Sequence, residues 1–295
     1  MITIKNEALT VQIAELGAEL QSIRSAAGRE YLWHGDGRYW NRRSPVLFPI
    51  VGNVWQKRYT HNGTEYAMGQ HGFARDMEFA VVRQSEAEVL FALESTPESL
   101  KLYPFDFRLE IGYALEGNLL RVSWHVVNTG TEEMPFQIGA HPAFIWDNAD
   151  ESRRGSFLFD NAGPVSGTLL DEGGCIHLEP QYFSQALEEA GEGEGRLRLT
   201  HDSFDAIDTL VLEHDQVHSV TLCDNQDRPI VRVRYAAPVL GLWTPTGLKA
   251  PFVCIEPWYG RCDRARGNSE LTTHDWTQHL QPAADFATDY TVELF

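Results

Sequence analysis

The chain has 295 residues, of which 43% are hydrophobic and 22% are charged, and this composition is typical of a folded globular protein with a large core. Its formal net charge of -18 disfavours contact with phosphate backbones and anionic headgroups, so we expect neither nucleic acid nor membrane surfaces as partners. No apolar run approaches the length of about eighteen residues that a membrane helix needs.

Two further features indicate a cytoplasmic protein. The first residues, MITIKNEALTVQIAELG, alternate in polarity and lack the apolar centre of a signal peptide. The cysteines contain no C-x-x-C pair, and a disulfide framework would need more of them in a shorter chain. We therefore expect reduced, structural thiols at Cys175, Cys223, Cys254 and Cys262.

In chain order, the dominant pattern is alternation of apolar and polar residues with the period of a strand. It is clearest in FDFRLEIGYAL (105–115), LRVSWHVV (120–127) and IVRVRYA (230–236). Turn residues separate such segments, as in EGN (116–118) and DNQDRP (224–229). With no break in composition, the pattern predicts an all-β protein, a large antiparallel β-sandwich forming a single domain over residues 1–295.

Helical signals are few and short. SQALEEA (184–190), with Ser184 as N-cap, predicts two helical turns, and NSELTTHDWTQHLQ (268–281) predicts one helix. The acidic, glycine-rich segment EEAGEGEGR (188–196) is expected to be an exposed loop. No strand–helix–strand rhythm is present, which argues against a doubly wound parallel sheet.

Two ionisable residues stand directly before prolines in apolar surroundings: His141 in GAHPAF (139–144) and Glu256 in FVCIEPWYG (252–260). A residue before proline is held in extended backbone, so we expect both at strand ends, with their side chains aimed by a fixed main chain. Apolar surroundings raise the pKa of a carboxyl toward the range of a general base. Neither residue alone indicates an enzyme, because a hydrogen-bonded core histidine and a paired strand-end charge are the commoner roles of such residues.

Two polar segments are further candidates for a binding site. MGQHGFARDMEF (68–79) places His71 and Arg75 close together, and Gly72 allows a left-handed turn beside the histidine. RYWNRRSPVLFPIVGN (38–53) supplies arginines that could bind an anion or simply line a strand edge. His214 and His218 have the spacing of a helical metal pair, but their surroundings predict strand, turn and strand, so no metal is expected.

Taken together, the segments resemble the aldose 1-epimerase (galactose mutarotase-like) family, in its LacX-like branch. The segments that carry the resemblance stand in the family's order: SPVLFPIVGN, HGFARD, GAHPAF, DTLVLEHDQVHSVTL and PFVCIEPWYG. The resemblance implies a galactose mutarotase-like supersandwich and an enzyme that interconverts the α and β anomers of a hexose without a cofactor. It implies Glu256 as base and His141 as acid, with His71, Arg75, Asp208 and Trp258 as substrate-binding residues.

One departure from the family bears on the substrate. The family usually has a sugar-binding arginine after the IVG strand, whereas here Asn53 follows Gly52. Asn53 and the nearby Lys57 and Arg58 are the candidates for its place, and the choice among them stays open. A hexose 6-phosphate substrate, or a non-catalytic carbohydrate-binding protein, are therefore kept as alternatives, and the oligomeric state stays open. Cations for a phosphate could come from Arg42, Arg43, Arg58 and Arg75, and the aromatic residues that could stack on a sugar are Trp146, Trp243, Trp258 and Tyr259.

Overall fold

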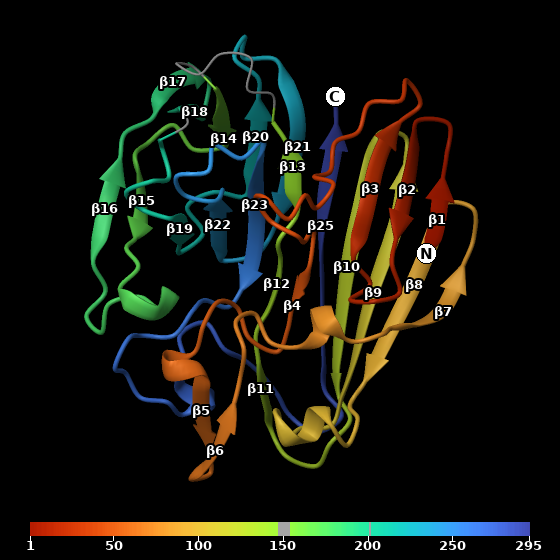
Figure 1. Cartoon of the computed structure of the whole chain (residues 1–295), viewed down its shortest axis with the longest axis vertical. Coiled ribbons are helices and arrows are strands. Elements are labelled where there is room, and N and C mark those ends of the chain that lie inside the picture. Colours follow the sequence, from red (N-terminus) through yellow and green to blue (C-terminus); the bar gives the residue numbers. More distant parts are fainter. Residues whose placement is uncertain (147–153, 201) are drawn as a thin grey trace.

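The computed structural model describes residues 1–146, 154–200 and 202–295, and its regular secondary structure is almost entirely antiparallel strand (Figure 1). Within these ranges no helix is long and apolar enough to cross a lipid bilayer. The helical elements are single 3-10 turns: η1 (Trp55–Lys57), η2 (Ala74–Asp76), η3 (Ser99–Lys101), η4 (Glu172–Gly174) and η5 (Leu271–Thr273).

The larger of two main sheets has ten strands, and the predicted alternation is confirmed in it. Leu109 and Ile111 face the core from one strand, and Val122 and Trp124 face it from the neighbour. In spatial order its strands are β17 (Glu188–Gly191), β18 (Glu194–Leu199), β14 (Gly155–Phe159), β20 (Ser219–Cys223), β21 (Pro229–Tyr235), β25 (Asp285–Leu294), β10 (Leu119–Asn128), β9 (Phe107–Glu116), β8 (Glu88–Glu94) and β7 (Ala80–Gln84).

The second main sheet has eight strands, and three small sheets complete the fold. In spatial order, the strands of the eight-stranded sheet are β16 (Tyr182–Gln185), β15 (Val165–Thr168), β19 (Thr209–Glu213), β22 (Val239–Trp243), β23 (Phe252–Tyr259), β12 (Ile138–Ala140) and β4 (Val46–Leu47). The eighth strand, β13 (Ala143–Ile145), also pairs with β23. The small sheets are β1 (Ile2–Lys5), β2 (Leu9–Ile13) and β3 (Leu20–Ser25); β5 (Arg58–His61) and β6 (Thr64–Ala67); and β11 (Met134–Phe136) and β24 (Gln278–Leu280).

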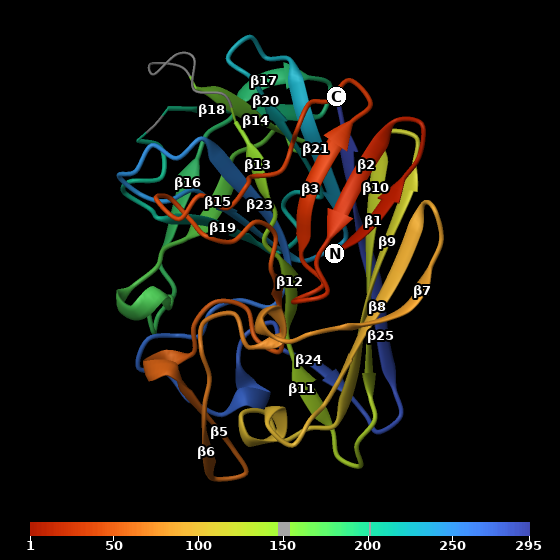
Figure 2. The same ribbon diagram turned by 45° about the vertical axis from the view of Figure 1, so that its right-hand side comes forward.

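One large hydrophobic core lies between these layers. It joins side chains of the ten-stranded sheet to those of the eight-stranded sheet, and to those of β1–β3, which cover the β8–β10 end (Figure 2). In β23 the odd-numbered Val253 and Ile255 enter this core, whereas Glu256 and Trp258 line a cavity on the opposite face. Alternation along one strand therefore separates the packing face from a face available for chemistry.

The position of Glu256 differs from the sequence expectation. It lies within β23 and not at a strand end, whereas His141 directly follows β12 as expected. Read along β23, pairing with β13 stops at Cys254 and pairing with β12 starts at Trp258. Pro257, which has no N–H to donate, lies in the gap between the two partners, so the strand continues through it.

Both predicted helices are wrong. Residues 184–190 fall on two edge strands, β16 and β17, and residues 268–281 hold only η5 and the short strand β24. The glycine-rich loop expected at 188–196 is the exposed hairpin of β17 and β18. Helices this short are unstable without tertiary support, and here the neighbouring strands β15 and β18 offer backbone partners instead.

Candidate active site

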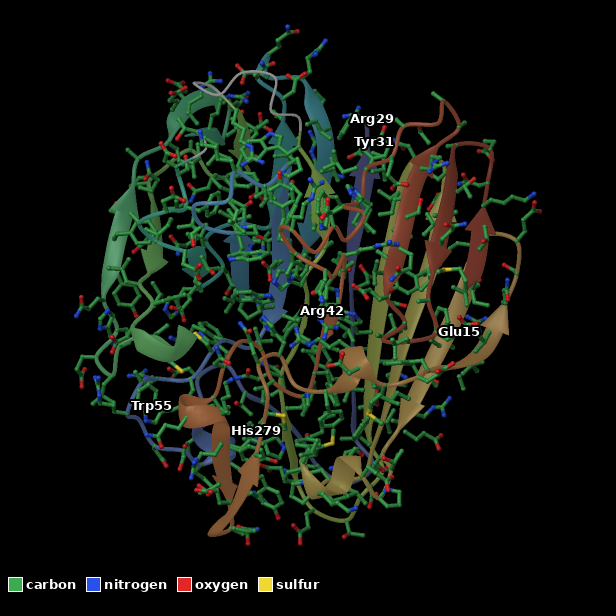
Figure 3. The ribbon with its side chains drawn as sticks, viewed as in Figure 1. Glu15, Arg29, Tyr31, Arg42, Trp55 and His279 are labelled. Atoms are coloured by element: carbon green, nitrogen blue, oxygen red, sulfur yellow. The ribbon has the colours of Figure 1, made fainter. Side chains whose placement is uncertain are left out.

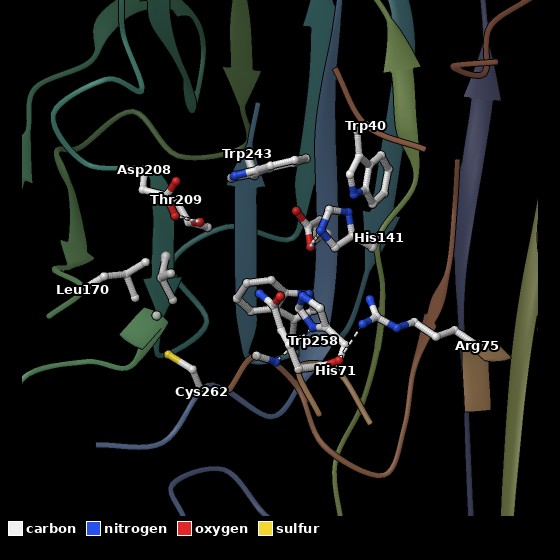
Figure 4. Close-up of a pocket in the computed structure, with 15 residues that line it drawn as sticks. Trp40, His71, Arg75, His141, Leu170, Asp208, Thr209, Trp243, Trp258 and Cys262 are labelled. Atoms are coloured by element: carbon white, nitrogen blue, oxygen red, sulfur yellow. Dashed lines mark hydrogen bonds and ion pairs between the residues drawn. The ribbon is translucent and has the colours of Figure 1, made fainter. Parts of the chain in front are cut away.

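A cavity of about 390 Å³ opens on the outer face of the eight-stranded sheet. Figure 4 shows side chains from strands and loops that converge on it. All six predicted site residues line it, together with Trp40, Gly52, Gln70, Leu170, Gly174, Thr209, Val211, Trp243 and Cys262. The cavity thus joins segments from residue 40 to residue 262, which no local sequence pattern could indicate.

His141 and Glu256 meet at the back of this cavity. Nε2 of His141 lies 3.3 Å from Oε2 of Glu256, and the two residues are only 7% and 1% exposed. Among the described residues, neither carboxylate oxygen of Glu256 has a hydrogen-bond partner, and neither does Nδ1 of His141. Buried polar atoms are rarely left unpaired, so this pair is arranged to meet polar atoms that enter through the cavity.

Burial shifts the two pKa values in opposite directions. It raises the pKa of Glu256 well above its usual range, with a further contribution from the negative charge of Asp208, whereas the nearby Trp258 acts in the opposite direction. Burial also lowers the pKa of His141 to about 3. Between these two values the pair holds one proton, on the carboxyl, and the short contact allows that proton to move between oxygen and nitrogen.

His71 is held as a neutral donor. Its backbone is left-handed, with φ of 63°, and Gly72 follows at 71°. The N–H of Gly52 donates to Nδ1 of His71 at 3.0 Å, so the ring's own proton must reside on Nε2. Burial lowers the pKa of His71 well below its usual value, and the nearby His141 lowers it further. His71 therefore offers the cavity an N–H and no charge.

Arg75 and Asp208 bring charge to different parts of the cavity wall. Arg75, on η2, donates from Nη2 to the carbonyl of Gln70 at 2.7 Å, and burial lowers its pKa to about 10. Asp208 precedes β19 with φ of 58° and accepts a hydrogen bond from the hydroxyl of Thr209 at 3.2 Å. Polar groups on more than one side of the cavity suit a ligand that carries several hydroxyls.

Trp258 lies flat across two glycines of neighbouring strands. Its register partner on β12 is Gly139, and Gly241 of β22 lies on its other side. An added Cβ would come within 2.5 Å of the indole at Gly139 and within 2.4 Å at Gly241. Only glycine leaves room for the indole at these positions, so the sequence builds an apolar wall for the cavity.

Gly241→Ala is expected to displace the Trp258 indole, to lower the free energy of unfolding by about 1–3 kcal/mol and to weaken ligand binding. Chemical denaturation and ligand titration would measure both effects. Gly69→Ala is the matched control, because a methyl group there would meet nothing within 4 Å. Wild-type stability and affinity in Gly241→Ala would contradict this account of the wall.

The structure divides the four aromatic residues that were expected as sugar contacts into two groups. Trp243 and Trp258 line the cavity, but Trp146 and Tyr259 do not. Trp146 is fully buried against Phe157, and the ring of Tyr259 packs on Phe286 on the core side of the sheet. Tyr259 occupies an odd-numbered position of β23, so the alternation that exposes Trp258 to the cavity turns its neighbour toward the core.

Sequence reasoning missed Trp40, which no periodic pattern singles out because it lies on a loop. Its ring stacks on the imidazole of His141, with ring centres 4.7 Å apart and planes 29° apart. Gln70 and Cys262 were also missed, and both lie outside regular strands. Thr209 could have been predicted as a cavity residue, because it directly follows Asp208, which was predicted.

Most of the proposed phosphate-binding arginines are engaged elsewhere. Arg42, labelled in Figure 3, donates to Asp76 at 2.8 Å, Arg43 to Gln21 and Arg58 to Glu65, and of the four only Arg75 lines the cavity. Asn53 buries its amide oxygen, and its amide nitrogen approaches Gly174. Neither Lys57 nor Arg58 lines the cavity, so neither takes the place of the missing family arginine.

One group of described residues could bring three metal-ligating atoms together. Atoms of His141, Cys254 and Glu256 lie within 4.8 Å of one another. Burial raises the pKa of the Cys254 thiol well above its usual value, so a metal would have to displace a firmly held proton. As predicted, His214 and His218 lie in the turn between β19 and β20 and not on a helix.

The buried histidines should make the fold acid-sensitive. The folded pKa values of His71 and His141 lie below their usual 6.5, so the unfolded chain binds more protons as pH falls. These neutral rings contribute their full stability above pH 6.5. The contribution is lost as the pH falls below 6.5, and for His141 the loss continues down to a pH of about 3. Urea unfolding at a series of pH values below 6.5 should show that the free energy of unfolding declines less steeply in His141→Phe than in the wild type. The same decline in both proteins would contradict a neutral, buried His141.

Comparison with known proteins agrees with this geometry. The family model described as Aldose 1-epimerase matches residues 1–265. The plasmid-encoded protein LacX of Lactococcus lactis subsp. lactis is 34% identical over 272 residues, which cover 88% of this chain and 87% of that protein.

Two solved structures are similar over nearly their whole length. A galactose mutarotase-like protein from Lactobacillus casei is 33% identical with a TM-score of 0.91, and each chain is covered completely. A galactose mutarotase related enzyme from Lactobacillus acidophilus is 30% identical with a TM-score of 0.89, covering 100% of this chain and 97% of that one. With a matching sandwich and a family model that spans most of its length, the chain belongs to the aldose 1-epimerase family of isomerases.

Proposed function

We propose that the protein interconverts the α and β anomers of a neutral hexose, with Glu256 as general base and His141 as general acid. The observation that carries the proposal is the contact of 3.3 Å between Nε2 of His141 and Oε2 of Glu256 at the back of one cavity. The C1 hydroxyl and the ring oxygen of a pyranose are bonded to the same carbon. Two groups this close can therefore reach both atoms at once.

The proposed reaction moves two protons and breaks one bond. Glu256 takes the proton of the C1 hydroxyl while His141 gives a proton to the ring oxygen. The bond between C1 and the ring oxygen breaks, and C1 becomes an aldehyde. After rotation about the C1–C2 bond the two residues exchange roles, and the ring closes on the other face of the aldehyde.

The proton count of the pair suits this chemistry. The reactive arrangement, a carboxylate beside an imidazolium, carries one proton, as does the neutral pair that burial favours in the free protein. A sugar hydroxyl that donates to the carboxylate, and a ring oxygen that accepts from the imidazolium, stabilise the charged arrangement. Substrate binding would thus move a proton within the pair without exchange with solvent.

The remaining residues are proposed to hold the sugar. The Nε2–H of His71 and the guanidinium of Arg75 would donate to hydroxyls on one side, and the carboxylate of Asp208 would accept from hydroxyls elsewhere on the ring. The flat face of Trp258 would pack on the apolar face of the pyranose. This division of donors, acceptor and apolar wall matches the mixed surface of a hexose.

A neutral substrate is favoured because, among the described residues, Arg75 is the only arginine or lysine that lines the cavity. Of the four candidate arginines only Arg75 lines it, and the carboxyl of Asp208 would repel an anion. The second candidate, a hexose 6-phosphate, is supported by one observation. Arg75 and Arg42 are both close enough to His71 to lower its pKa, so two guanidiniums lie near that part of the cavity.

Anomer exchange followed by NMR tests both versions. Glucose, galactose and glucose 6-phosphate would each be compared with the rate in buffer alone. We expect faster exchange of the neutral sugars and little effect on the phosphate. Failure to accelerate any of the three would refute the proposed reaction, whereas a clear preference for the phosphate would refute only the neutral substrate.

A further inference from the structure

The imidazole of His141 is held without an orienting hydrogen bond. Its Nε2 faces Glu256, and its Nδ1 is buried with no partner among the described residues. Histidines that transfer protons are usually fixed by a hydrogen bond to the ring nitrogen that does not react. Something else must therefore define the plane of this ring.

Three aromatic side chains surround the imidazole instead. Trp40 stacks on its face at 4.7 Å, Trp243 meets it edge-on at 5.4 Å, and His71 meets it at 5.5 Å with the planes 89° apart. Trp243 lies on β22 and His71 is tied to Gly52 by backbone and ring hydrogen bonds. Of the three contacts, the Trp40 contact alone is face to face, and it comes from a loop.

The loop that carries Trp40 is fixed at several points. The indole N–H of the buried Trp33 donates to the carbonyl of Trp40 at 2.9 Å, and the N–H of Trp40 donates to the carbonyl of Asp36 at 3.0 Å. The Trp40 ring also packs against Trp243 and Phe252. A loop side chain with this many contacts can hold a defined orientation.

We propose that Trp40 is a positioning residue for His141, which fixes the plane of the imidazole by stacking on it and shields the ring from water. This inference rests on the proposed function, in which His141 transfers the proton to the ring oxygen. Without the indole, the imidazole could turn about its own bonds, because its Nδ1 has no hydrogen-bond partner among the described residues and its one polar contact is that of Nε2 with Glu256. A general acid that points away from the ring oxygen cannot donate to it, so the loss would fall on kcat.

The stacking also affects the pKa of His141, and the direction of this effect depends on which of two contributions is larger. The indole face favours an imidazolium by about 0.5–2 kcal/mol, or roughly one pKa unit. Burial acts in the opposite direction and dominates, since it lowers the pKa of His141 from 6.5 to about 3. The charged or titratable groups that face the ring or act on it are Glu256, Cys254, His71, Arg75 and Arg42. Removing the indole admits water, so the pKa of His141 should rise.

Steady-state kinetics of anomer exchange provide the first test, with Trp40→Leu and Trp40→Phe as a pair. Leucine keeps the residue apolar but removes the flat ring, and we expect kcat to fall by about 10- to 100-fold while KM changes by less than about threefold. Phenylalanine keeps a ring to stack and should restore most of kcat. Tyr39→Leu is the matched control, because Tyr39 is on the same loop and packs on Trp33.

A kcat in Trp40→Leu equal to that of the wild type would overturn the inference, and so would a loss confined to KM, which would make Trp40 a sugar contact. The second readout needs no turnover. NMR titration of the imidazole of His141, assigned by comparison with His141→Gln, should show a pKa that moves up toward 6.5 in Trp40→Leu but not in Tyr39→Leu. An unchanged pKa would refute the shielding role. If the wild type did not accelerate anomer exchange, the proposed function would be refuted. The titration would still test the contact between Trp40 and His141.

Discussion

Replacing Glu256 by glutamine is expected to lower kcat for anomer exchange by about 10²- to 10⁴-fold, the range that a positioned acid–base group contributes. Glutamine has the same shape and fits the same buried position on β23, but it cannot take the proton of the C1 hydroxyl. Sugar affinity should change little, because the groups proposed to hold the ring are other side chains, which an isosteric glutamine leaves in place. NMR exchange spectroscopy and a binding titration would measure the two effects separately.

The stability of Glu256→Gln, measured against pH, shows whether the variant is folded. The folded pKa of Glu256 lies well above its usual 4.5, so the native protein retains a proton that the unfolded chain releases. Stability therefore falls as pH rises from 4.5 through the folded pKa, and Glu256→Gln removes that decline. We expect the variant to be at least as stable as the wild type at neutral pH. Retained turnover in a folded Glu256→Gln protein would contradict the proposed base.

His141→Gln is expected to have the second largest effect, also a loss of about 10²- to 10⁴-fold in kcat. The glutamine amide can place a nitrogen near the position of Nε2 and keep contact with Glu256, but it cannot donate a proton to the ring oxygen and then recover it. Because each residue serves as acid in one half of the reaction and as base in the other, exchange should slow in both directions. Rates measured from each pure anomer would test this symmetry.

The double variant separates a joint mechanism from two independent contributions. If Glu256 and His141 act on one hemiacetal, removing the second group after the first should cost little more activity. Losses that multiply in the double variant would mean that the two residues act independently. A His141→Gln protein with nearly wild-type kcat would remove the proposed acid, and His71, which lines the same cavity, would become the next candidate.

The strand predictions succeeded where one face of a segment is buried. In β9, β10 and β21 the predicted apolar series enters the core, because alternation along a strand allows only one arrangement when one face must avoid water. These series take every second residue from Phe107 to Tyr113, from Leu120 to Val126 and from Val231 to Tyr235. The helix predictions at 184–190 and 268–281 failed for the opposite reason. Those segments have no face that burial dictates, and their conformation is set by the strands or turns beside them.

Part of the candidate site could be predicted because its ionisable residues occur in unusual sequence surroundings. Glu256 and His141 stand out in apolar segments before prolines, and His71 and Arg75 share one short segment. Trp40 gave no such signal, since a tryptophan near arginines is as typical of a surface loop as of an active site. Trp146 and Tyr259 were plausible sugar contacts by residue type, yet the fold turned them to the core side.

By itself the sequence determined which residues can exchange protons and which faces of the strands must be buried, because residue type and alternation are local properties. Only the tertiary structure decided that His141 and Glu256 meet at 3.3 Å, that Trp40 covers the imidazole, and that most of the arginines are engaged away from the cavity. The physical reason is that distances between segments far apart in the chain are set by the pairing of β12, β22 and β23 and by the packing of the sheets, and no short stretch of sequence encodes either.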